Sequence, residues 1–132
     1  MVPWKDVLTD DEIRELYRRA SVVLLPGEED FGIVPLEAQA CGRPVVALGR
    51  GGALETVKAG ETGEHVAELS AEAFADGIAR ALAARYDSAT IRSHAERFGR
   101  ARFGDEIEGL VQTVRADAAV RTAATVRAEA QR

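Results

Sequence analysis

The sequence of 132 residues is long enough for one domain, and its apolar share of 46% can form a buried core. The net charge of −5 argues against a general nucleic-acid surface. We expect neither a transmembrane segment nor a signal peptide, because no apolar run is long enough and the first residues lack the pattern. A single cysteine excludes an internal disulfide and fits a cytoplasmic protein.

The first predicted element is a helix over residues 10–20. Thr9 and Glu12 have the spacing of a capping box, in which each side chain bonds the other residue's backbone N–H. Apolar residues at helical spacing then mark one buried face. The apolar run over residues 22–25 predicts a strand that is covered on both faces.

Residues 26–42 form the segment around which the chain is organised. An acidic loop leads to Pro35, whose fixed φ suits a first helical turn, and Gly42 then suits the end of that helix. Another apolar run, residues 44–48, predicts the next buried strand. Strand, loop, helix and strand make a parallel βαβ unit, so we expect an α/β fold with a Rossmann-like parallel sheet and flanking helices.

The later elements follow from the same signals. After a glycine-rich turn at residues 49–52 we expect a short helix over 53–59, ended by Gly60, and a strand over 64–67. Further helices are predicted over residues 71–84, 88–98 and 103–114. The side chains expected to face inward from the first two are Phe74, Ile78, Ala81, Leu82, Ile91, Ala95 and Phe98. Residues 115–132 are predicted to be a helical or disordered tail, so we divide the chain into 1–114 and 115–132.

The start of the central helix predicts a ligand site. Gly32 allows another group to approach the backbone, and free N–H groups with the positive end of the helix dipole suit a phosphate. Glu29 and Glu37 flank this point, with seven residues between them. Carboxylates accept hydrogen bonds, so this pair suits a hydroxyl-rich ligand such as a sugar or a ribose.

The remaining reactive residues predict no second site. Cys41 lies inside the central helix and is expected to be a small buried residue. His65 and His94 are far apart in sequence and lack the spacing of metal ligands, so we expect structural or surface roles and no metal.

The string from Glu29 to Ala38, together with Ala40-Cys-Gly-Arg-Pro-Val-Val46, resembles the donor-binding signature of retaining glycosyltransferases of family four, which have GT-B architecture. The resemblance extends over about residues 4–114, because the glycines and Glu55 of the downstream turn also match. It implies that the chain is a later part of the C-terminal, donor-binding half. It also implies transfer of a hexose from a nucleoside-diphosphate sugar with retention, without a metal or other cofactor in the donor site.

The resemblance also implies roles for individual residues. Glu37 corresponds to the glutamate that binds the ribose hydroxyls, and Glu29 to the one beside the transferred sugar, where it positions or stabilises. Backbone N–H groups of Phe31, Gly32 and Ile33 would bind the sugar and phosphates, although Phe31 equally suits core packing. Gly51 and Gly52 could also approach the donor, but an ordinary turn is the preferred interpretation.

Two features set this chain apart from the family pattern. We find no counterpart of the basic pair that neutralises the donor diphosphate, and the acceptor-binding half is absent. The isolated chain is therefore expected to be inactive. The alternatives are a non-catalytic nucleotide-binding or interaction module that needs a partner chain, and an incomplete gene product. The exposed sheet edge also predicts self-association.

Overall fold

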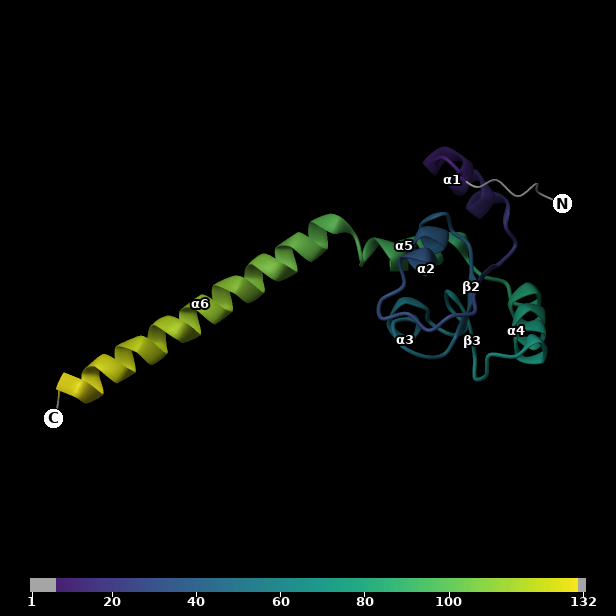
Figure 1. Ribbon diagram of the computed structural model, residues 1–132. Coiled ribbons are helices and arrows are strands. Elements are labelled where there is room, and N and C mark those ends of the chain that lie inside the picture. The colour runs from purple at the N-terminus through teal and green to yellow at the C-terminus, as the bar shows by residue number, and fades with distance from the viewer. Residues whose placement is uncertain (1–6, 131–132) are drawn as a thin grey trace. The chain divides into compact units, whose positions relative to one another are not determined.

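The computed structural model describes residues 7–130, which form an α/β arrangement of helices and strands (Figure 1). In chain order the elements are α1 (Asp10–Arg19), β1 (Val23–Leu25), α2 (Ile33–Ala40), β2 (Val45–Leu48), α3 (Ala53–Thr56), β3 (Gly63–Val66), α4 (Ala71–Ala83), α5 (Ser88–Glu96) and α6 (Arg100–Ala130). The chain divides into two compact units, one ending at Arg97 and the other beginning at Phe98.

The sheet of the first unit is parallel throughout, in the order β1-β2-β3. Val23 pairs with Val45, and Val45 pairs with Gly63. Helices cover both faces of β2, whose residues are all buried (Figure 1). The cluster on the α2 and α3 face consists of Leu25, Ala38, Val45, Ala47, Ala53 and Val57. The cluster on the α4 face consists of Val46, Leu48, Val66, Phe74 and Ala81. The predicted βαβ unit and Rossmann-like sheet are confirmed.

The central helix begins two residues earlier than Pro35. Gly32 is its N-cap with a φ of 80°, a left-handed conformation that favours glycine. At the other end, Gly42 adopts a φ of 74° and donates to the carbonyl of Gln39. Arg43 donates to the carbonyl of Ala38, which completes a Schellman motif. The predicted role of Gly42 in ending this helix is therefore confirmed.

Several expected boundaries and faces were wrong. Leu24 is 43% exposed, because β1 lies at the edge of the sheet and α4 packs over β2 and β3 instead. The α3 helix ends at Thr56, three residues early, and β3 begins one residue early at Gly63. Leu82 is 57% exposed, and Gly77 takes the inward position on α4. The capping box of α1 agrees with expectation, and that helix ends at Arg19, one residue before the expected end.

The second unit consists largely of α6. The helix runs through residue 114 to Ala130, which agrees with the helical alternative for the tail, and the division at residue 114 stays a prediction. Within α6, exposed apolar side chains recur at helical spacing: Phe103, Ile107, Leu110, Val111 and Val114. None of the described helices is long and apolar enough to cross a membrane.

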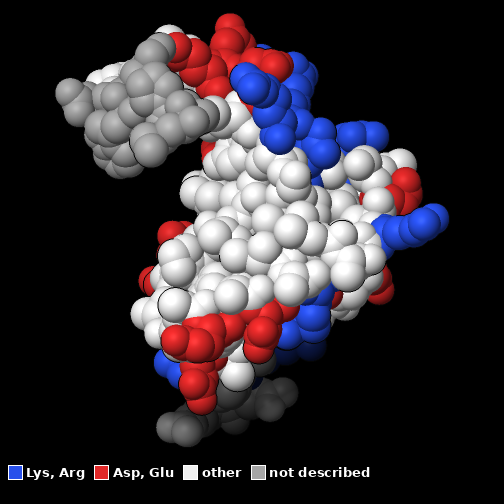
Figure 2. All heavy atoms as spheres, turned by 90° about the vertical axis from the view of Figure 1, so that its right-hand side faces the viewer, with Lys and Arg blue, Asp and Glu red and all other residues white. Residues whose placement is uncertain are grey.

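Charge is distributed unevenly on the face shown in Figure 2. Acidic and basic side chains gather toward its ends, and a band of uncharged side chains lies between them. Among the described residues on this face, basic side chains do not form a continuous surface. The expectation that nucleic acid is not a partner stays a prediction.

Candidate functional site

The loop before α2 lies at the carboxyl edge of the sheet, where parallel folds bind ligands. No side chain caps the start of α2, so the first backbone N–H groups of this helix lack a side-chain acceptor. Ile33 is 64% exposed and Phe31 is 46% exposed, which excludes full core burial for Phe31. Of the predicted phosphate-binding residues, Phe31 and Ile33 are thus exposed, whereas Gly32 between them is buried.

A second loop, residues 49–52, is hydrogen-bonded to the loop that carries Glu29. The N–H of Gly52 donates a hydrogen bond of 2.7 Å to the carbonyl oxygen of Glu29. A Cβ at Gly51 would overlap that same carbonyl, and a Cβ at Gly52 would overlap the backbone of Phe31. Only residues without a side chain allow this approach. Glycines at these positions therefore join the loops, and contact with a donor stays a prediction for both.

Hydrogen bonds from buried polar side chains hold the second loop in position. The Thr56 hydroxyl donates to the Gly52 carbonyl at 2.9 Å, and Gln39 Nε2 donates to the Thr56 carbonyl at 2.7 Å. His94 Nε2 bonds the same carbonyl at 3.2 Å, and His65 Nε2 bonds the Ala53 carbonyl at 3.2 Å. Desolvation lowers the pKa of His94, and Lys58 and Arg97 lower it further, whereas the Thr56 carbonyl and Glu61 oppose this shift. Both histidines therefore have structural roles.

Glu37 lies on the side of α2 that meets α1. Its Oε2 accepts a hydrogen bond of 2.9 Å from the Tyr17 hydroxyl. Burial raises the pKa of Tyr17 to about 12, with further contributions from the bond to Glu37 and from the charges of Glu37 and Cys41. The two side chains line a groove of about 330 Å³ between the helices. The other residues that line it are Asp10, Ile13, Arg14, Ala40 and Cys41.

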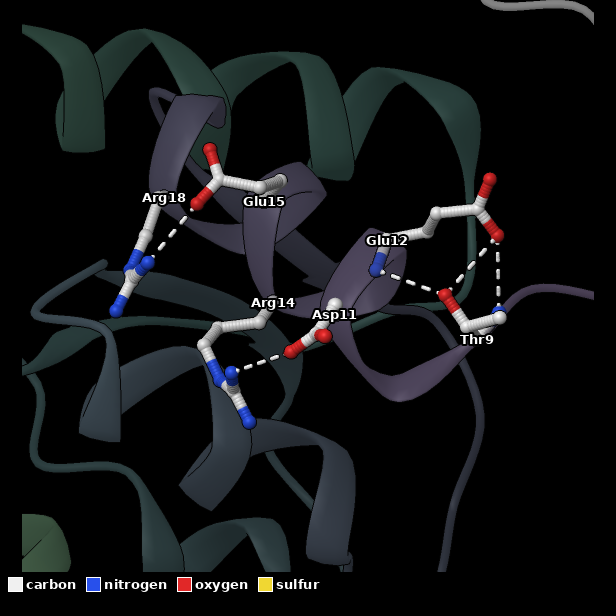
Figure 3. A network of polar contacts seen from close by, with 6 residues as sticks. All are labelled: Thr9, Asp11, Glu12, Arg14, Glu15 and Arg18. Atoms are coloured by element: carbon white, nitrogen blue, oxygen red, sulfur yellow. Dashed lines mark hydrogen bonds and ion pairs between the residues drawn. The ribbon is translucent and has the colours of Figure 1, made fainter.

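Cations near this groove pair within their own helix. Arg14 bonds Asp11 at 2.7 Å, and Arg18 bonds Glu15 at 2.9 Å (Figure 3). Among the described residues, neither a lysine nor an arginine forms an ion pair with Glu37. Its carboxylate therefore keeps acceptor capacity for a ligand. Cys41 is partly exposed at this groove, so the expectation of a small buried residue was wrong.

The structure brings together Glu29, Phe31, Gly32, Gly51 and Gly52 through direct loop contacts, and Ile33 follows at the start of α2. Glu37 lies farther along α2, and among the described contacts its side chain meets Tyr17 at the groove beside α1 and not these loops. The roles of Tyr17 and Thr56 were missed, because these residues lie on elements elsewhere in the sequence, and the role of Gln39 in α2 was missed because its partner Thr56 is 17 residues away. Among residues 7–130, His, Cys, Asp and Glu do not gather into a group that could hold a metal ion.

Comparisons with known proteins agree on one family. The family model "Glycosyl transferases group 1" matches residues 2–101. A D-inositol 3-phosphate glycosyltransferase from Acidothermus cellulolyticus is 39% identical over 122 residues, which cover 89% of this chain and 27% of that protein. The corresponding protein from Geodermatophilus obscurus is 40% identical over 119 residues, which cover 88% and 26%.

A solved structure supports the same assignment. Sucrose-phosphate synthase from Thermosynechococcus elongatus matches with a TM-score of 0.57 and 34% identity, over 83% of this chain and 29% of that one. The chain thus spans little more than a quarter of the length of these relatives.

Proposed function

Because this chain belongs to the group 1 glycosyltransferases, we propose that it forms part of the donor-binding side of a retaining enzyme. The reaction transfers a hexose from a nucleoside-diphosphate sugar to an acceptor. The observation that carries this proposal is the uncapped start of α2 between Glu29 and Glu37, at the carboxyl edge of the sheet.

Each part of the donor has a chemical match at this point. The backbone N–H groups at the start of α2, which no side chain caps, suit the diphosphate, because they add to the positive end of the helix dipole. The carboxylate of Glu37 accepts hydrogen bonds from the two neighbouring hydroxyls of the ribose. Glu29 lies on the loop that precedes the phosphate-binding backbone, and it positions or stabilises the transferred sugar. We assign no metal to the donor site.

The acceptor side is outside this proposal. The relatives are named for D-inositol 3-phosphate, but this chain spans about a quarter of their length. We therefore expect the chain alone to bind donor without turnover, since the acceptor-binding half is a separate part of a GT-B enzyme.

The second candidate is a non-catalytic module that acts with a partner chain. The observation in its favour is the open edge of β1, which pairs with β2 alone among the described strands. A strand from another chain would satisfy the unpaired backbone groups of this edge. Turnover after mixing with a chain that supplies the missing part would favour a divided enzyme over a binding module.

Calorimetric titration tests the proposal. We expect the chain to bind at least one of UDP, GDP and ADP, and Glu37→Ala to weaken that binding by roughly 10- to 100-fold, as loss of charge-assisted hydrogen bonds requires. Glu72→Ala, at the start of α4, is the matched control and should bind like the wild type. Absence of binding to every nucleoside diphosphate, or unchanged binding by Glu37→Ala, would contradict the proposal.

A further inference from the structure

The contact between Tyr17 and Glu37 joins two helices that are distant in sequence. The Tyr17 ring packs against the cluster formed by Leu25, Ala38 and their neighbours, so the position of its hydroxyl is fixed by the core. Glu37, by contrast, is an exposed helix residue. A carboxylate at such a position normally samples several rotamers, and a hydrogen bond from a fixed donor restricts it to one of them.

The geometry leaves the rest of the carboxylate available. Tyr17 donates to Oε2, and it is the hydrogen-bond partner that the described residues supply to Glu37. Oε1 therefore keeps its lone pairs for hydroxyl donors. Both side chains border the groove between α1 and α2, and its other charged or ionisable members are Asp10, Arg14 and Cys41. Arg14 is bonded to Asp11, so it does not compete for Glu37.

We propose that Tyr17 is a positioning residue that holds the Glu37 carboxylate ready for the 2′- and 3′-hydroxyls of the donor ribose, and thereby makes the site select ribonucleotides. This inference rests on the proposed function, which assigns Glu37 to the ribose. Tyr17 supplies preorganisation: the rotamer freedom of Glu37 is already restricted before the nucleotide arrives. Loss of the hydroxyl removes this advantage without removing the carboxylate.

A comparison of two ligands with three proteins tests the role of Tyr17. The ligands are the nucleoside diphosphate that the wild type binds best and its 2′,3′-dideoxy analogue. We expect the wild type to prefer the ribonucleotide, and Tyr17→Phe to weaken ribonucleotide binding about tenfold while binding of the dideoxy analogue stays unchanged. Tyr86→Phe, whose hydroxyl bonds Glu64 and the Gly63 carbonyl away from the groove, is the control.

The outcomes separate the two proposals. A wild type that binds neither ligand, or binds both alike, overturns the ribose role of Glu37 and with it the role of Tyr17. A wild type that discriminates, together with an equally discriminating Tyr17→Phe, overturns only the inference about Tyr17. An equal loss of affinity for both ligands in Tyr17→Phe also overturns it, because that loss indicates a general structural effect.

A second measurement tests the contact without a ligand. In the Tyr86→Phe background Tyr17 is the remaining tyrosine, so its ionisation can be followed by ultraviolet absorbance. We expect a titration well above the ordinary value, with a pKa near the value of about 12 that burial and Glu37 produce. Glu37→Gln should lower that pKa, because it removes the charge beside the phenol. Identical titration curves with and without Glu37→Gln would overturn the inference.

Discussion

The side chain of Gln39 in α2 donates a hydrogen bond of 2.7 Å to the carbonyl oxygen of Thr56 in α3, and both residues are fully buried. Thr56 in turn bonds the carbonyl of Gly52, whose own N–H bonds the carbonyl of Glu29. A continuous series of hydrogen bonds therefore connects the core to the loop that carries Glu29. The position of this loop depends on residues that a donor would never contact.

Thr56→Val should loosen the loop of Glu29. The substitution preserves the shape of the side chain and removes one hydrogen bond to the Gly52 carbonyl, which keeps the backbone N–H groups of Glu55 and Thr56 as donors, so we expect the free energy of unfolding to fall by about 1 kcal/mol. Hydrogen exchange at the Gly52 amide should accelerate as well, because this amide bonds the Glu29 carbonyl. Denaturant unfolding and amide exchange measure the two effects.

Thr113→Val provides the matched control. Thr113 makes the same hydroxyl-to-carbonyl bond, to Gly109, on the exposed surface of α6. Its loss should change stability by less than about 0.5 kcal/mol, as is usual for surface substitutions. An equal effect of the two substitutions, or an unchanged exchange rate at Gly52, would refute the role of this bond in holding the loop.

Gly52→Ala should be more harmful than alanine at Gly60 or Gly27. At Gly52 the backbone φ is −63°, so the expected loss of about 2 kcal/mol or more comes from overlap with the Phe31 backbone alone. Gly60 has the opposite features, a φ of 80° with open space, and Gly60→Ala should cost about 1 kcal/mol. Gly27→Ala introduces neither overlap nor backbone strain, so it should leave the free energy of unfolding nearly unchanged. Thermal unfolding of the three variants gives the order, and a Gly52→Ala variant as stable as Gly27→Ala would contradict the loop contact.

Acidification should destabilise the protein through His94. Desolvation lowers the pKa of this histidine, so the unfolded chain binds its proton at higher pH than the folded protein does. The contribution of His94 to the free energy of unfolding is therefore fully present above about pH 6.5. Below this pH it declines by at most about 1.4 kcal/mol per pH unit. We expect His94→Gln to flatten the dependence of unfolding free energy on pH in this range. Ser93→Ala, an exposed neighbour on α5, should keep the slope; an unchanged slope in His94→Gln would count against this explanation.

Leu24→Lys should reduce self-association. The exposed Leu24 lies on the edge strand β1, and a charge there opposes pairing with another strand. We expect the wild type to associate with increasing concentration in sedimentation experiments and Leu24→Lys to remain monomeric. Leu110→Lys, on the exposed apolar side of α6, is the control. If Leu110→Lys prevents association and Leu24→Lys does not, the contact lies on α6 and the prediction for the sheet edge is wrong.

Much of the fold could be predicted because helix caps and turns depend on residues that are close together in the sequence. The capping box of Thr9 and Glu12 and the glycine cap at Gly42 depend on neighbours in the sequence, and the structure has both. The exposure of Leu24 could not be predicted from an apolar run, since that run does not say how many strands lie beside it. Between the helical and disordered alternatives for the tail, the structure has the helix, because alanine and arginine favour a helix even where apolar periodicity fades.

The residues of the candidate site were proposed from the sequence alone, whereas the residues that support them were not. Glu29, Gly32 and Glu37 stand out in the sequence because they share one ordered segment. The partners of that segment, Tyr17 and Thr56, are 20 and 17 residues away from the groups that they bond, Glu37 and Gln39. Such contacts form only when the helices pack, so no local sequence pattern predicts them.

An amide-resolved NMR titration of the full chain with UDP and GDP tests the central claim most directly. We predict chemical-shift changes that cluster at residues 31–36 and 49–52 and are lost in Glu37→Ala, because the proposed function places the donor at the start of α2 and the adjoining loop. A well-dispersed spectrum that shows no changes at these residues, or changes that persist in Glu37→Ala, would contradict the account.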